Sequence, residues 1–176
     1  GRIHAEKSGV AHFLVSSEYE ALDLSRKILT YFPANNCENP PTIKAEDGLR
    51  ACPELSKIVP TQQMSRPYDI RDVITTIVDR DSFLEVHALF SQNVRVGLAR
   101  LNGQPVGIIG NNPAVLAGVL DIDASRKAAR FIRTCNAFGI PIISLIDVPG
   151  FLPGQSQEHG AIIDHGAKLA YAYCEA

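Results

Sequence analysis

The sequence IISLI at residues 142–146, followed by DVPGFLPG at residues 147–154, decides how the rest of this chain is interpreted. The first stretch is short, bounded and almost wholly apolar, which is the pattern of a strand buried on both faces of a sheet. The second contains two Pro-Gly steps, which predict a sharp loop at the carboxyl end of that strand. Because Gly150 and Gly154 lack side chains, their backbone can approach a ligand closely. Ligands bind outside the carboxyl ends of strands in open α/β sheets, so we expect a site in this loop.

The residues before this loop predict strands and a helix. Strand-like runs at 94–101 and 104–110 are separated by Asn102-Gly103, which is the strongest short-range signal for a hairpin. A helical stripe then follows Asp123, which we expect to cap that helix. Glycines at 107 and 110 favour close backbone packing or a ligand-facing loop, because they lack the Gly-x-Gly-x-x-Gly spacing of a dinucleotide site.

Three further helical patterns complete the prediction. One follows Ser17, in a capping box completed by Glu20, and another follows Asp69. The third covers residues 161–170, after the Pro-Gly loop. The order of helix, hairpin, helix, strand and helix is typical of an α/β layered fold.

The composition changes between residues 34 and 67, where prolines are frequent and periodicity is lost. Such a stretch is long for a loop inside one domain, so we interpret it as a linker. We therefore expect three parts: 1–33 as the end of one domain, 34–67 as a Pro-rich linker, and 68–176 as the first part of a second domain. The chain begins without Met and stops within a helical pattern, so we expect a segment of a longer polypeptide.

Charge and composition argue against several classes of protein. The net charge of −2 gives no reason to expect a nucleic acid partner, and no apolar stretch approaches the roughly 20 residues that span a bilayer. The four cysteines form no Cys-x-x-Cys pair, which argues against a zinc site and favours reduced thiols. We expect a cytoplasmic protein, or one of the mitochondrial matrix if the source is eukaryotic.

The residues in and around the Pro-Gly loop bear on several kinds of chemistry. An Asp-x-x-Gly step after a buried strand also occurs in GTPases, but these need a Gly-x-x-x-x-Gly-Lys-Ser/Thr loop, which the sequence lacks. Alternatively, Asp147 is only a local cap in a tight turn. His159 and His165 are six residues apart, which is the wrong spacing for two metal ligands on one helix face, so we predict no metal. Ser144 lies inside the strand and is not in a nucleophile elbow.

Gln157 and Glu158 are the polar pair nearest the loop. They orient a substrate or cap the amino end of the last helix, where a negative charge is favourable. The sequence thus predicts rigid turns with accessible main-chain groups, and it shows no evident nucleophile, general base or metal site. That combination indicates chemistry in which main-chain N–H groups stabilise an oxyanion while a cofactor carries the reactivity.

The chain resembles the carboxyltransferase (β) subunit of biotin-dependent acyl-CoA carboxylases, of the propionyl-CoA carboxylase β and methylmalonyl-CoA carboxyltransferase type. The resemblance covers nearly the whole chain. It is carried by DVPGFLPG at 147–154, QE at 157–158, GAII at 160–163, HGAKL at 165–169, GIIGN at 107–111, LDI at 120–122, KAARFIR at 127–133 and SGVAH at 8–12.

This resemblance implies an α/β fold of the ClpP/crotonase type, a ββα superhelix that is only partly present. It also implies transfer of a carboxyl group from carboxybiotin, held on a separate biotin carrier, to a short-chain acyl-CoA such as propionyl-CoA. Backbone oxyanion holes would stabilise the enolates, and no side chain need act as base. The expected partners are a biotin carboxylase or biotin carrier subunit and further copies of the chain, since the family forms dimer-based hexamers. No nucleic acid and no membrane insertion are expected.

In the family, the two oxyanion loops would lie before residue 1 and after residue 176, so the resemblance assigns no catalytic residue to this segment. It places Gly150, Phe151 and Leu152 beside the biotin and acyl pocket, with Gln157 and Glu158 behind them. The loop that begins at Asn111 is a further candidate.

Two other functions stay open at this point. One is the α subunit of a biotin-dependent decarboxylase of the methylmalonyl-CoA or glutaconyl-CoA type. The other is a non-catalytic assembly module.

Overall fold

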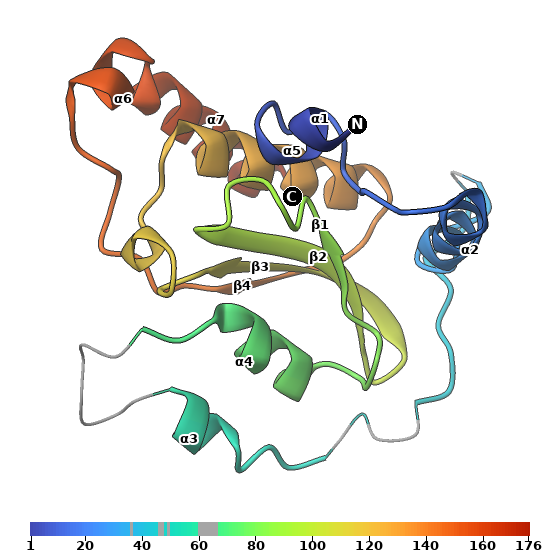
Figure 1. Ribbon diagram of the computed structural model, residues 1–176. Coiled ribbons are helices and arrows are strands. Elements are labelled where there is room, and N and C mark those ends of the chain that lie inside the picture. The colour runs from blue at the N-terminus through green and yellow to red at the C-terminus, as the bar shows by residue number, and fades with distance from the viewer. Residues whose placement is uncertain (36, 46–47, 49, 60–66) are drawn as a thin grey trace.

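A four-stranded sheet forms the centre of the computed structural model, which describes residues 1–35, 37–45, 48, 50–59 and 67–176. The strands β1 (Leu84–Val86), β2 (Val94–Leu101), β3 (Gln104–Asn111) and β4 (Ile142–Leu145) lie in that order across the sheet. The pairs β1–β2 and β2–β3 are antiparallel, whereas β4 is parallel to β3 (Figure 1). Parallel neighbours require a crossover, which a helix between β3 and β4 provides.

The predicted hairpin is confirmed. Asn102 and Gly103 have φ of 51° and 78°, which suits a tight turn whose twist matches the flanking strands. The carboxylate of Asp79 accepts hydrogen bonds from both backbone N–H groups, at 2.9 Å from Asn102 and 2.7 Å from Gly103. The turn is therefore held by a side chain from outside the hairpin as well as by its own sequence.

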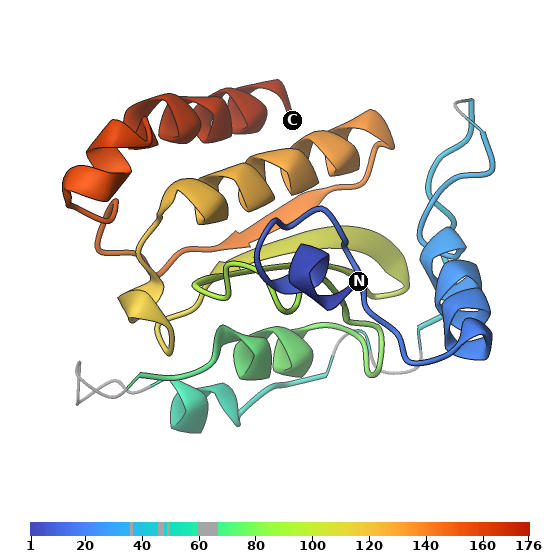
Figure 2. The ribbon, with the colours of Figure 1, turned by 45° about the horizontal axis from the view of Figure 1, so that its top comes forward.

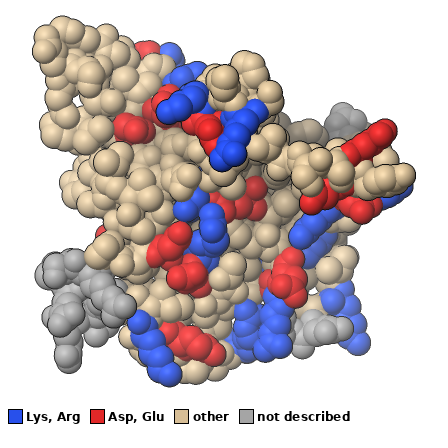
Figure 3. Space-filling view, viewed as in Figure 1, with Lys and Arg blue, Asp and Glu red and all other residues tan. Residues whose placement is uncertain are grey.

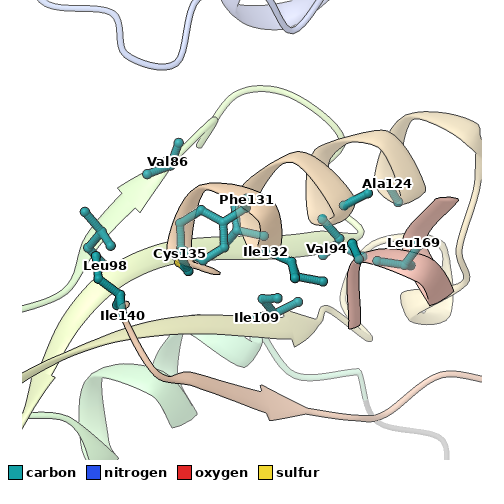
Figure 4. Packing of buried hydrophobic residues seen from close by; sticks show 14 of the residues in the cluster. Val86, Val94, Leu98, Ile109, Ala124, Phe131, Ile132, Cys135, Ile140 and Leu169 are labelled. Carbon is teal, nitrogen blue, oxygen red and sulfur yellow. The ribbon is translucent and has the colours of Figure 1, made fainter. Parts of the chain in front are cut away.

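Helices cover both faces of the sheet. On one face lies α5 (Ile122–Ala137), with α7 (Ile162–Glu175) packed on its outer side, and on the other lies α4 (Ile70–Ile77) (Figure 2). Each face has its own buried apolar cluster. Gly107 permits the close approach of β3 and α5, because an added Cβ there would lie 2.6 Å from Cys135 Sγ. Side chains of β2, β3 and α5 interdigitate in the larger cluster (Figure 4).

The remaining elements lie around this body: α1 (Arg2–Glu6), α2 (Glu18–Leu29), α3 (Leu55–Ile58), the 3₁₀ turn η1 (Leu116–Gly118) and α6 (Gln155–His159). Tyr31, just after α2, is 3% exposed and belongs to the larger cluster. Segment 1–33 therefore packs against the same sheet as the residues after 68. Residues 36, 46–47, 49 and 60–66 of the predicted linker lie outside the described residues. The division at 33 and 67 stays a prediction.

Two local expectations need correction. The cap of α5 is Asp121, whose Oδ1 accepts from the N–H of Ala124 at 2.7 Å, rather than Asp123, which lies in the first turn. The strand β4 is only half-buried, because it is the outermost strand of the described sheet. Within the described residues, no helix is both long and apolar enough to cross a membrane.

Candidate functional site

The Pro-Gly loop, residues 146–154, leaves the carboxyl end of β4 and rises to α6 (Figure 1). Its two glycines are required by backbone conformation rather than by crowding. Gly150 has φ of 144° and Gly154 has φ of 129°, which side-chain-bearing L-residues rarely adopt. A Cβ added at either position would meet no described heavy atom within 4 Å. The loop therefore presents bare backbone to open space, as the sequence predicted.

A short parallel bridge holds this loop against the segment before α5. The N–H of Leu120 donates to the carbonyl of Gly150 at 3.0 Å, and the N–H of Leu152 donates to the carbonyl of Leu120 at 2.8 Å. The N–H groups of Gly150 and Phe151 make no hydrogen bond to any described residue. Two adjacent main-chain donors are thus left for an external acceptor.

The turn η1 supports the loop from beneath. Gly118 has φ of 72°, and an added Cβ would lie 2.7 Å from the carbonyl oxygen of Asp147. Asn111, a predicted site residue, uses its side chain to donate from Nδ2 to the carbonyl of Gly118 at 3.0 Å. Asn111 thus positions η1, and Gly118 is a contributor that sequence reasoning missed. The signal that could have found it is an isolated glycine between two apolar pairs, Leu116-Ala117 and Val119-Leu120.

Asp147 is tied to a distant part of the chain instead of capping its own turn. Its Oδ2 accepts from the hydroxyl of Tyr68, just before α4, at 2.6 Å. Burial, together with this bond to the carboxylate, raises the pKa of Tyr68 to about 12, so the hydroxyl stays protonated and keeps donating. The link anchors the start of the loop to the opposite side of the sheet.

Gln157 and Glu158 have different surroundings. Gln157 Oε1 accepts from the N–H of Ile122 at 3.1 Å, so it caps α5 rather than the last helix. Glu158 is exposed, and its side chain makes no hydrogen bond within the described part of the chain. The ring of Phe151 lies against Gly166 of α7, where an added Cβ would be 2.7 Å from the ring. Of the predicted site residues, Gly150, Phe151 and Leu152 are joined with Asn111 and Gln157 at one end of the sheet, around the start of α5.

Replacing Gln157 with Leu should remove an N-terminal cap of α5 and lower the free energy of unfolding by about 1 kcal/mol. Urea unfolding of the full-length protein measures this. A Gln157→Glu variant keeps the acceptor and should be close to wild type, since a carboxylate is favourable at a helix amino end. Equal losses in both variants would contradict the capping role.

The surface around the loop carries little charge. In the space-filling view, the lobe that α6 and its preceding loop form is mostly uncharged, whereas both signs are mixed elsewhere on that face (Figure 3). No group of three or more His, Cys, Asp or Glu side chains within the described ranges could hold a metal ion. The arrangement therefore offers backbone hydrogen-bond donors in weakly charged surroundings.

Comparisons with known proteins match all or nearly all of the chain to carboxyltransferases and their relatives. The family model described as carboxyl transferase domain matches residues 1–176. The propionyl-CoA carboxylase carboxyltransferase subunit of Haloferax mediterranei is 53% identical, with 98% of this chain and 34% of that protein covered. The methylmalonyl-CoA decarboxylase subunit alpha of Propionigenium modestum is 46% identical, with the same coverage of 98% and 34%. The chain thus spans about a third of the length of these relatives.

A solved structure of transcarboxylase 12S, with methylmalonyl-coenzyme A and methylmalonic acid bound, matches with a TM-score of 0.95. The two are 44% identical, and the match covers 99% of this chain and 34% of that one. This likeness confirms the predicted crotonase-like α/β fold. Because the family model covers every residue, the chain belongs to the carboxyl transferase domain family.

Proposed function

We propose that this chain is part of an acyl-CoA carboxyltransferase that moves a carboxyl group from carboxybiotin to a short-chain acyl-CoA such as propionyl-CoA. The observation that carries the proposal is the near-complete structural match, with a TM-score of 0.95, to a transcarboxylase that holds methylmalonyl-coenzyme A. The relatives named for propionyl-CoA carboxylase support the same substrate class.

The loop residues fit a ligand of this kind. Carboxybiotin, presented by its carrier, would supply the carboxyl group for transfer. Its oxygens, and those of a thioester, are hydrogen-bond acceptors, and the N–H groups of Gly150 and Phe151 have no acceptor among the residues that the structure describes. Donors fixed in a rigid turn stabilise developing negative charge without reorganising during the reaction. In this role Gly150 and Phe151 bind an oxygen, while Asn111 and Gln157 position the turn and helix beside them.

Replacing Gly150 with Val in the full-length protein tests this role. The side chain would occupy the open space above the loop and move the backbone out of its φ of 144°. We expect carboxyl transfer from carboxybiotin to propionyl-CoA to fall on the order of 100-fold in kcat/KM, as small misplacements of a binding group do.

Gly139 offers a matched control, since it also has positive φ, of 64°, and open space around it, but lies at the opposite end of α5. A Gly139→Val variant also places a branched side chain at a positive φ, and it should keep its carboxyl transfer. If both variants transfer carboxyl groups at the wild-type rate, the loop has no part in the site.

The decarboxylase relative supports a second candidate, removal of a carboxyl group from methylmalonyl-CoA onto biotin. The same loop could serve either direction, because both involve a thioester enolate and a biotin-bound carboxyl group. Assaying the full-length protein with methylmalonyl-CoA and free biotin, and identifying the subunits that copurify with it, separates the two.

The remaining proposals concern assembly and compartment. A biotin carboxylase or biotin carrier subunit is the proposed partner, together with further copies of the chain, since transcarboxylase 12S is described as a hexamer assembly. The proposed compartment is the cytoplasm, or the mitochondrial matrix in a eukaryote, and the mitochondrial propionyl-CoA carboxylase beta chain of Sus scrofa supports the latter.

A further inference from the structure

The start of the Pro-Gly loop is held at Asp147 from two sides. Its main chain lies against η1, where an added Cβ on Gly118 would be 2.7 Å from the Asp147 carbonyl oxygen. Its carboxylate is bound by a different part of the chain, since Oδ2 accepts from the hydroxyl of Tyr68 at 2.6 Å. In both ribbon views the start of α4, which follows Tyr68, lies at the same end of the sheet as the loop (Figures 1 and 2).

The turn η1 has an unusual backbone conformation. Three consecutive residues, Leu116, Ala117 and Gly118, have φ of 48°, 52° and 72°. This left-handed region is unfavourable for residues that carry a side chain, and it persists only where the surrounding structure holds it. The hydrogen bond from Asn111 Nδ2 to the carbonyl of Gly118, at 3.0 Å, is one such restraint. The main chain of Asp147 therefore rests on a turn that is itself fixed.

Tyr68 reaches Asp147 from a backbone that is also fixed. The carbonyl of Tyr68 accepts from the N–H of Ala114 at 3.1 Å. Two residues later, Ile70 is 3% exposed, and its N–H donates to Oδ1 of the fully buried Asn112 at 3.2 Å. The hydroxyl of Tyr68 thus extends from the anchored start of α4. The side chain of Asp147 makes no second hydrogen bond within the described part of the chain, so the bond from Tyr68 sets its direction.

The segment between Asp147 and the free donor of Gly150 is short and stiff. Only Val148 and Pro149 separate the two residues. The proline ring fixes its own φ and restricts Val148 to extended conformations. On the far side, the carbonyl of Gly150 accepts from the N–H of Leu120 at 3.0 Å. The N–H of Gly150 lies between these two anchors, so its direction depends on both of them.

We propose that Tyr68 is a positioning residue for carboxyl transfer: by donating to Asp147, it sets the direction in which the N–H of Gly150 meets the reacting oxygen. This role rests on the proposed function. Tyr68 acts through Asp147 and need not touch the acyl-CoA or biotin. The expected signature is a loss in the rate of transfer without a matching loss in substrate binding, because the negative oxygen exists only in the transition state.

Kinetics of the full-length protein test this role. Tyr68→Phe keeps the ring and removes the hydroxyl. We expect kcat for carboxyl transfer to propionyl-CoA to fall about tenfold with KM nearly unchanged, the weaker end of the effect of a hydrogen bond to a charged group. Tyr171→Phe is the matched control, because Tyr171 is 70% exposed on α7, and it should transfer as wild type does.

Variants of the acceptor separate a shared link from two independent effects. Asp147→Ala should lower kcat by the same factor as Tyr68→Phe, and the double variant should lose no more than either single variant, since both remove one bond. Asp147→Asn keeps an oxygen that can accept and should lose only about threefold, because a neutral hydrogen bond is about half as strong as a charged one. Losses that multiply in the double variant would overturn the proposal.

Hydrogen exchange follows the same link without an assay of activity. The N–H of Leu152 donates to the carbonyl of Leu120 at 2.8 Å, so its exchange reports whether the loop stays in place. By mass spectrometry, a peptide covering residues 146–154 should exchange up to about tenfold faster in Tyr68→Phe than in wild type or Tyr171→Phe. Peptides from α5 and α7 should exchange as in wild type, which shows that the fold is intact.

The two measurements distinguish the possible failures. Faster exchange with unchanged kcat would show that the bond holds the loop without positioning a donor, which overturns the role of Tyr68. Unchanged exchange in both Tyr68→Phe and Asp147→Ala would overturn it as well. In each of these cases the wild-type protein transfers carboxyl groups. A wild-type protein that transfers none, even with its biotin carrier supplied, would instead refute the proposed function and, with it, the role of Tyr68.

Discussion

Replacing Lys127 with Met is expected to lower the free energy of unfolding by about 3 kcal/mol, because it leaves backbone carbonyls that are buried in the folded protein without a hydrogen-bond donor. Lys127 is 2% exposed, and its Nζ donates to the carbonyls of His87, Phe90, Ser91 and Val94 at distances from 2.7 to 3.2 Å. Met fills a similar volume but leaves three buried carbonyl oxygens and one half-buried one without this donor. The connection between β1 and β2 would lose its tie to α5.

Urea unfolding of the full-length protein measures the loss. Lys168→Met is the matched control, because Lys168 is exposed on α7 and forms a surface ion pair with Asp164, at 2.7 Å. Such surface pairs contribute about 0–1 kcal/mol. A Lys127→Met variant as stable as the control would show that water replaces the ammonium group at no cost.

We also expect Lys127 to make the free energy of unfolding depend on pH. Burial lowers the pKa of Lys127 from 10.5 to about 7. Between these values the unfolded chain binds the proton more tightly than the folded chain, so the contribution of Lys127 to stability rises with pH across this window and is lost as pH falls towards 7. The rise should be absent in Lys127→Met.

Replacing Arg100 with Met is expected to cost about 3 kcal/mol, because it leaves three buried or half-buried carbonyls without a charged donor. Arg100 is 5% exposed on β2. Its Nη1 donates to the carbonyls of Pro41 and Gly103 at 2.8 and 2.9 Å, and its Nη2 donates to that of Thr30 at 2.6 Å. One guanidinium group therefore joins the end of α2, the predicted linker and the hairpin turn.

An Arg100→Lys variant separates the contribution of the positive charge from that of the planar guanidinium geometry. A lysine keeps the charge but has a compact head group, which cannot span carbonyls that a planar fork reaches. We expect it to recover less than half of the loss. Arg126→Met, which removes an exposed pair with Asp123 at 3.2 Å, is the control and should change stability by less than about 1 kcal/mol. Full recovery by lysine would show that charge alone holds the three segments. Limited proteolysis should also cleave near residue 41 faster in Arg100→Met than in the control.

Much of this protein follows from local sequence. Asn102-Gly103 requires a hairpin because both residues take positive φ without great strain, and the register of β2 and β3 follows from it. The Pro-Gly loop is equally local, since only glycine readily adopts the backbone found at Gly150 and Gly154. The helical stripes of α4 and α5 also appear as predicted. The family follows from contiguous motifs along nearly all of the chain, in agreement with the match to residues 1–176.

The polar side chains whose partners lie far away in the sequence were paired by the tertiary structure alone. Asp147 accepts from Tyr68, 79 residues away, and Gln157 caps a helix that begins 35 residues earlier. Neither pairing can be recognised from periodicity or from neighbouring residues in the sequence. These contacts form only when the sheet brings distant segments together. Lys127 and Arg100 appear in the sequence as ordinary charged residues, yet packing buries both among backbone carbonyls. Periodicity and turn chemistry report on neighbouring residues, whereas the burial of a charge depends on the whole chain around it.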